Sequence, residues 1–153
     1  MQKSELIPRL IAILEEQHAL LQRALDESRE NASGDETKSE GKYDTRATEA
    51  AYLAEAQAEQ AAQMAEGIAT LKAFTAPDFQ LTDPIGLGAL VETDLDGETL
   101  FYLLAPAGGG TTLDFLGCEL TVLTPEAPLY QQLLARKAGE SLQDQSLLLL
   151  GVE

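Results

Sequence analysis

The stretch Ser33–Asp44, which reads SGDETKSEGKYD, separates two long segments whose apolar residues recur at helical spacing. It contains two glycines, no large aliphatic residue, and acids at Asp35, Glu36, Glu40 and Asp44. Glycine and small polar residues favour a connection over a continuing helix. The pattern therefore predicts an antiparallel helical hairpin with this acidic stretch at its far end.

The apolar residues on either side of the stretch follow alternating steps of three and four, which is a heptad seam. The first seam is Ile7, Leu10, Leu14, Gln17, Leu21, Ala24 and Ser28, and the second is Ala47, Ala50, Ala54, Gln57, Ala61, Met64, Ile68 and Leu71. In an antiparallel pair the large early residues of the first segment face the large late residues of the second. A parallel dimer would instead place Leu14 opposite Leu14 and leave the alanine seam unexplained, so the intramolecular hairpin is favoured.

Composition limits the classes of partner. The formal net charge is −16, which repels nucleic-acid phosphates, so no sequence-specific DNA binding is expected. Cys118 is the only cysteine, which excludes an intramolecular disulfide and indicates a reducing compartment. The first twenty residues are amphipathic and carry three glutamates, unlike a signal peptide, and no apolar run is long enough to span a bilayer. A soluble, cytoplasmic protein is the expectation.

The second half reads as a small α+β domain that follows a linker at residues 76–84. Gly88–Glu92 and Thr99–Leu104 are predicted strands joined by a turn at Asp94–Gly97. A further strand is predicted at Glu119–Leu123, and Pro128 is suited to open a short helix through Leu134. The run from Ser146 to Val152 predicts a final strand that is buried on both faces. Strands with one short helix indicate an α+β arrangement.

Three parts of the chain resemble bacterial Gre transcript-cleavage factors, in the same order. The run PLYQQLLARKAGE at Pro128–Glu140 is similar to the segment SPLARALLGKRVGDEV of that family, without a gap. Gly88–Val91 and Asp96–Glu98 resemble the hairpin of the same domain. At the tip, Gly34-Asp35, Ser39-Glu40 and Tyr43-Asp44 are similar to the family's GDLSENAEYD. The resemblance covers nearly the whole chain, and the order of the motifs carries it.

The resemblance implies an antiparallel coiled-coil hairpin at residues 1–76 and a domain of FKBP-like fold at residues 77–153. In that family the globular domain docks beside the secondary channel of RNA polymerase, and the hairpin enters the channel. The matched acids Asp35 and Glu40 would then assist a Mg²⁺ shared with the polymerase active site, with Asp44 as a further ligand and no cofactor bound stably. The partner-binding residues would be Pro128, Leu129, Leu133, Leu134, Arg136, Lys137 and Gly139. The chain would act as a monomeric accessory factor and not as an enzyme.

The tip departs from the family's spacing. Asp35 and Glu40 lie five residues apart where the family places its acids three apart, and Lys38 and Lys42 bring positive charge beside them. These departures favour polymerase binding over stimulated cleavage, so a factor that occupies the channel without activating cutting fits as well. The alternative to a metal-binding role for the tip acids is a solvated polar loop between the two helices. The alternative to partner binding by Arg136 and Lys137 is a favourable interaction with a helix C-terminus.

A different class of function stays open from the residues alone. In this alternative the hairpin is only an interaction rod of a structural or adaptor protein, without any activity directed at polymerase. It predicts another partner or self-association through the helices. An independent hydrolase is disfavoured, because His18, the only histidine, falls on the predicted coiled coil.

Overall fold

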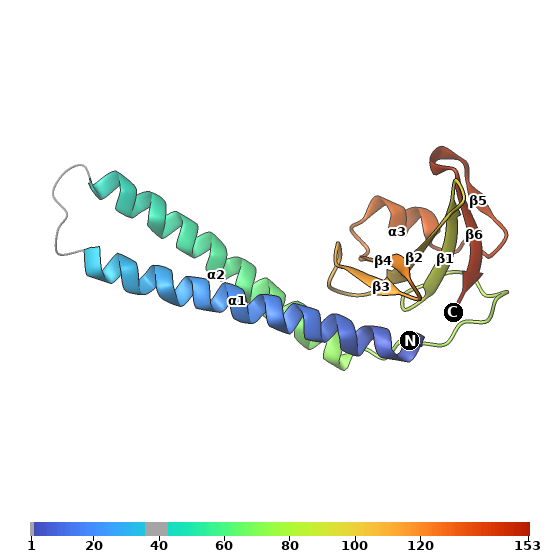
Figure 1. Ribbon diagram of the computed structural model, residues 1–153, viewed down its shortest axis with the longest axis horizontal. Coiled ribbons are helices and arrows are strands. Elements are labelled where there is room, and N and C mark those ends of the chain that lie inside the picture. The colour runs from blue at the N-terminus through green and yellow to red at the C-terminus, as the bar shows by residue number, and fades with distance from the viewer. Residues whose placement is uncertain (1, 36–42) are drawn as a thin grey trace. The chain divides into compact units, whose positions relative to one another are not determined.

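The structure, a computed structural model, describes residues 2–35 and 43–153 (Figure 1). Side chains are described for these residues except 31–35, 43–47 and 145. Two long helices precede a mixed six-stranded sheet with one short helix, which confirms the predicted α+β class. The chain divides into two compact units: a helical unit, Ala12–Glu66, and a sheet unit, which combines Met1–Ile11 with Gly67–Glu153.

The helical unit consists of most of α1 (Leu6–Asp35) and α2 (Tyr43–Ala73), which run antiparallel (Figure 1). Leu14, Leu25 and Ala61 are buried in this unit, and Met64 is half-buried. A small alanine lets the two backbones approach closely, and alanine also has the highest helix propensity. The predicted hairpin is therefore present, and both helices extend further toward the connection than the sequence indicated.

The buried stripe of α1 differs from the predicted seam toward the connection. Leu25 is 1% exposed, whereas the seam residues Gln17 and Ala24 are exposed. His18 and Leu21 are half-buried and continue the stripe between Leu14 and Leu25. An α-helix has 3.6 residues per turn, so a straight helix drifts away from a strict heptad and moves the contact line by one residue.

The sheet has the strand order β3-β4-β2-β1-β6-β5. The strands are β1 (Leu90–Leu95), β2 (Glu98–Leu104), β3 (Thr112–Phe115), β4 (Cys118–Leu123), β5 (Ser141–Leu142) and β6 (Leu147–Val152). Only β2 and β4 pair in parallel, and the other four pairs are antiparallel. The sequence had indicated four of these strands, and β3 and β5 were missed.

The β1–β2 hairpin turns at Asp96 and Gly97, within the predicted turn at Asp94–Gly97. Both residues have positive φ, +52° and +91°, which is the requirement of a type I′ turn. Asp94 supports the turn because its carboxylate accepts a hydrogen bond from the Gly97 amide at 2.7 Å. The only fully buried polar side chain among the described residues is Thr93, whose hydroxyl donates to the Leu100 carbonyl at 2.8 Å.

One face of the sheet packs under the short helix α3 (Pro128–Leu133). Proline at the first helical position has no amide to leave unpaired, and its fixed φ suits the start of a helix. Tyr130 and Leu133 point from α3 into a core with Val91 and Leu149 of the sheet. Each buried leucine contributes about 1.5–3 kcal/mol relative to an exposed one, so these contacts fix α3 against the strands.

The final strand, β6, is buried on one face only, so the prediction of a doubly buried strand was wrong. Leu147 and Leu149 are at most 1% exposed, whereas Leu148 and Leu150 are each 41% exposed. Strand side chains alternate between faces, and the face of β6 opposite α3 lies partly open to solvent. An uninterrupted run of leucines therefore hid an alternating strand.

The opposite face of the sheet is also apolar, with Leu103, Phe115 and Leu120 buried. The parts of α1 and α2 that belong to the sheet unit add four buried side chains to it: Leu6, Leu10, Ile68 and Leu71. The Arg9 guanidinium donates to the Asp114 carbonyl of β3 at 3.0 Å, which ties the start of α1 to the edge of the sheet. The first turns of α1 thus belong to the fold of this unit.

Candidate functional site

The predicted tip lies mostly outside the residues that the structure describes. Glu36 and Glu40 fall in the connection at residues 36–42, which is outside the described part. Asp35 is the last residue of α1, and Asp44 follows the first residue of α2, but their side chains are also outside it. The metal assignment of Asp35, Glu40 and Asp44 therefore stays a prediction. Among the described residues, no cluster of three or more acidic, histidine or cysteine side chains is arranged to hold a metal ion.

The predicted partner-binding segment lies on α3 and the loop that follows it. Leu133 is 0% exposed and belongs to the core, whereas the adjacent Leu134 is 42% exposed. Pro128 is exposed and Leu129 is half-buried against the core. Consecutive leucines thus divide between the interior and the surface, and Leu134 is the leucine that this segment exposes.

The loop after α3 is held on two sides by backbone hydrogen bonds. The Ala135 amide donates to the Ile85 carbonyl at 2.9 Å, and the Ile85 amide donates to the Arg136 carbonyl at 2.8 Å. At the other end the Gly139 amide donates to the Leu149 carbonyl of β6 at 2.7 Å. Arg136 and Lys137, both exposed, are carried on this fixed loop.

Arg136 and Lys137 are the only basic residues among residues 76–153, which contain twelve acids. The Glu140 carboxylate accepts a hydrogen bond from the Lys137 amide at 2.6 Å, so this acid supports the loop backbone beside the two cations. Gly139 has a φ of +91° and is exposed. The segment therefore exposes one leucine and two cations on a backbone that hydrogen bonds hold in place.

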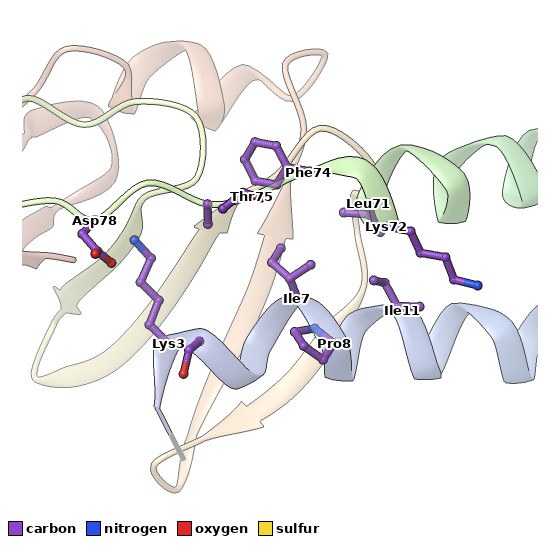
Figure 2. Close-up of a pocket in the computed structure, with 11 residues that line it drawn as sticks. Lys3, Ile7, Pro8, Ile11, Leu71, Lys72, Phe74, Thr75 and Asp78 are labelled. Atoms are coloured by element: carbon purple, nitrogen blue, oxygen red, sulfur yellow. The ribbon is translucent and has the colours of Figure 1, made fainter.

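A second site lies where the start of α1, the end of α2 and residues 74–78 meet within the sheet unit. A cavity of about 370 Å³ is lined there by Ile7, Ile11, Leu71 and Phe74, among others (Figure 2). Figure 2 shows Lys3 extending toward Asp78 from a short 3-10 helix, Lys3–Glu5, that precedes α1. The start of α1 and the end of α2 thus lie beside residues 74–78 around this cavity.

Lys3 is the polar centre of this region, and the sequence analysis missed it. Its ammonium donates to the Pro77 carbonyl at 2.7 Å and lies 5.0 Å from the centre of the Phe79 ring. Partial burial lowers the pKa of Lys3, although the Asp78 and Glu153 carboxylates raise it. No local pattern marks Lys3, because its partners lie more than seventy residues away.

Similarity to known proteins is found at the level of structure. No protein-family model and no curated protein matches this sequence. Among the described residues, no helix is both long and apolar enough to cross a membrane. Among solved structures, the chain is similar to GreA factor homolog 1 (Gfh1) of Thermus thermophilus, with a TM-score of 0.37 and 16% sequence identity over 94% of each chain.

Proposed function

We propose that this protein is a Gre-like transcription elongation factor that binds RNA polymerase and inserts its helical hairpin into the secondary channel. The carrying observation is that each matched motif falls on the kind of element that the resemblance implies. The tip match joins two antiparallel helices, Asp96–Glu98 forms the turn and start of a strand hairpin, and Pro128–Glu140 forms a short helix and a fixed loop.

The sheet unit would supply the docking contact. Leu134, Arg136 and Lys137 are exposed on a loop whose backbone is already fixed, so binding would cost little loop ordering. The two cations stand out in a strongly acidic half-chain. An acidic rim on the polymerase would be attracted to this loop and repelled by the rest of the unit, which would orient the encounter.

The hairpin tip would supply carboxylates. Asp35 and Glu40, with Asp44, are hard oxygen donors of the type that Mg²⁺ prefers, so the donor set fits that ion. Bound between these acids and the polymerase, Mg²⁺ would stabilise the attacking and leaving oxygens of phosphodiester cleavage. The part of this chain is to hold carboxylates at the end of two helices, with Lys38 and Lys42 reducing the local negative charge.

Polymerase binding is tested by a pull-down of core RNA polymerase with the full chain at micromolar concentration and modest salt. We expect retention of polymerase, and we expect other secondary-channel ligands to compete for it. If no polymerase is retained under these conditions, the proposed function is wrong.

The role of the tip acids is tested by the double variant Asp35→Ala/Glu40→Ala in a cleavage assay on stalled transcripts. If the tip assists metal, the variant loses cleavage by about a hundredfold or more while polymerase binding is unchanged, because carboxylate ligands are removed without altering the docking loop. The matched control is Glu49→Ala/Glu55→Ala, which removes the same charge from exposed positions of α2. Unchanged cleavage in the tip variant would exclude these carboxylates, and no cleavage by the parent chain would leave channel occupation as the function.

An adaptor role is the second candidate, because the helical unit exposes three large apolar side chains. Leu20, Tyr52 and Leu53 are 57%, 67% and 60% exposed. Such residues on a rod suit a partner helix or a second copy. Solution mass measurement discriminates the two candidates: a stable dimer that Tyr52→Ser/Leu53→Ser converts to monomer would favour the adaptor.

A further inference from the structure

A second exposed apolar surface lies in the sheet unit, beside the end of β6. It is a groove of about 460 Å³, called here the Leu116 groove, and its principal lining residues are Phe79, Leu81, Phe101, Phe115, Leu116 and Leu150. On β6, Leu150 alternates with Leu149, which packs in the core under α3. None of residues 128–140 lines the groove, so it does not include the α3 loop.

The floor of the groove is rigid and aromatic. The rings of Phe101 and Phe115 meet edge to face, with centroids 4.9 Å apart and an interplanar angle of 79°. Both side chains are nearly buried. The walls of the groove are exposed to solvent: the exposed fractions are 60% for Leu81, 63% for Leu116 and 41% for Leu150. A fixed aromatic floor with open leucine walls is the form of a pocket that receives an apolar side chain.

Leu116 occupies a backbone position that disfavours leucine. It has a φ of +54° and is followed by Gly117 at +78°, so the β3–β4 turn has two successive positive φ values. The β1–β2 turn has nearly the same φ values and carries Asp96-Gly97, the ordinary choice. A leucine there adds backbone strain and, being mostly exposed, recovers little by burial. Folding alone therefore gives no reason for a leucine at this position.

The polar groups around the groove give the sign of the partner's charge. Glu92 and Glu153 line the groove, and Asp78 and Lys3 line an adjoining hollow that shares Glu153 and Leu116 with it. Lys3 is already engaged by the Pro77 carbonyl and the Phe79 ring. The three carboxylates outnumber this one cation, so the rim attracts positive charge.

We propose that the Leu116 groove binds a segment of a partner protein that carries a large apolar side chain flanked by lysine or arginine. The apolar side chain packs on Phe101 and Phe115 between the leucine walls, and the basic flanks face Glu92 and Glu153. A second copy of this chain fits poorly, because two molecules of net charge −16 repel one another. The proposal does not rest on the proposed function, since the α3 loop is not part of this surface.

The test uses Leu116→Asn in the full chain and a labelled short peptide with two leucines flanked by lysines. Asparagine tolerates positive φ, so the variant should raise the midpoint of thermal unfolding by about 2–4 °C. The same variant should weaken peptide binding, measured by fluorescence anisotropy, by about tenfold. The matched control is Leu87→Asn, which changes an exposed leucine outside the groove and should leave peptide binding unchanged.

Three results would overturn the proposal. The first is equal peptide affinity in Leu116→Asn and the parent chain. The second is equal affinity for a peptide in which glutamates replace the flanking lysines, because the rim would then confer no charge preference. The third is a solution dimer that Leu116→Asn dissociates, because the occupant would then be a second copy. Polymerase retention by Leu116→Asn, measured in parallel, should equal that of the parent chain and keeps this test separate from the proposed function.

Discussion

Replacing Gly88 by alanine is expected to lower the free energy of unfolding by about 2–5 kcal/mol, from backbone strain together with overpacking. Gly88 has a φ of +92°, where an L side chain is strained. A Cβ at this position would lie 2.5 Å from Pro77 Cδ and 3.2 Å from the Phe74 ring. The Gly88 amide also donates to the Leu104 carbonyl of β2 at 2.7 Å, so the backbone cannot move away without losing that bond.

The matched control for Gly88→Ala is Gly97→Ala, because Gly97 has nearly the same φ, +91°, with no atom within 4 Å of the added methyl group. Gly97→Ala should therefore cost only the backbone part, about 1–2 kcal/mol. Chemical denaturation of both variants measures the difference. Equal losses in the free energy of unfolding would show that Pro77 and Phe74 shift to accommodate the added methyl group at Gly88. Their contact with Gly88 would then not be rigid.

The helical part of the fold follows from local patterns, because the helical spacing of apolar residues marks the two helices, although the buried stripe of α1 drifts from the heptad seam after Leu14. Pro128 and Asp96-Gly97 also marked α3 and the first strand turn, since each residue type has a specific backbone preference. These features depend on near neighbours in the sequence. They could be predicted without knowing what packs against them.

The missed strands depend on distant partners. β3 is only four residues long, and its turn carries Leu116-Gly117, which does not resemble a type I′ sequence. β5 has two residues and is defined by its pairing with β6. The open face of β6 was likewise hidden, because Leu148 and Leu150 look like core residues until the sheet is assembled. Strand pairing and exposure of this kind are tertiary properties.

For the candidate site, sequence identified residue types and structure assigned their exposure. The Pro128–Glu140 match named Leu133 and Leu134 together, although only Leu134 is on the surface. Lys3 and the Leu116 groove were not identified, because their contacts join the first turn, the linker and the sheet across the whole chain. For the predicted tip acids Asp35, Glu40 and Asp44, the argument rests on the sequence alone, because their side chains lie outside the described part of the chain.

The adjacent leucines of the α3 segment give a second large and separable effect. Leu133→Ala should lower the free energy of unfolding by about 2–5 kcal/mol, because it removes a fully buried side chain and leaves a cavity under α3. Leu134→Ala should change it by less than about 0.5 kcal/mol, because that side chain is 42% exposed. Denaturant unfolding monitored by circular dichroism measures both.

When polymerase binding is measured on folded protein, Leu134→Ala should have the larger effect and Leu133→Ala the smaller one. Under the proposed function, Leu134→Ala removes an exposed contact and weakens polymerase retention by about tenfold, the range expected for an apolar contact at the centre of an interface. Leu133→Ala, assayed at low temperature where it stays folded, should retain polymerase nearly as well as the parent chain, because its side chain cannot reach a partner. If Leu134→Ala binds polymerase normally, the docking surface does not include the α3 loop, and the resemblance at Pro128–Glu140 reflects only shared packing of the helix on its sheet.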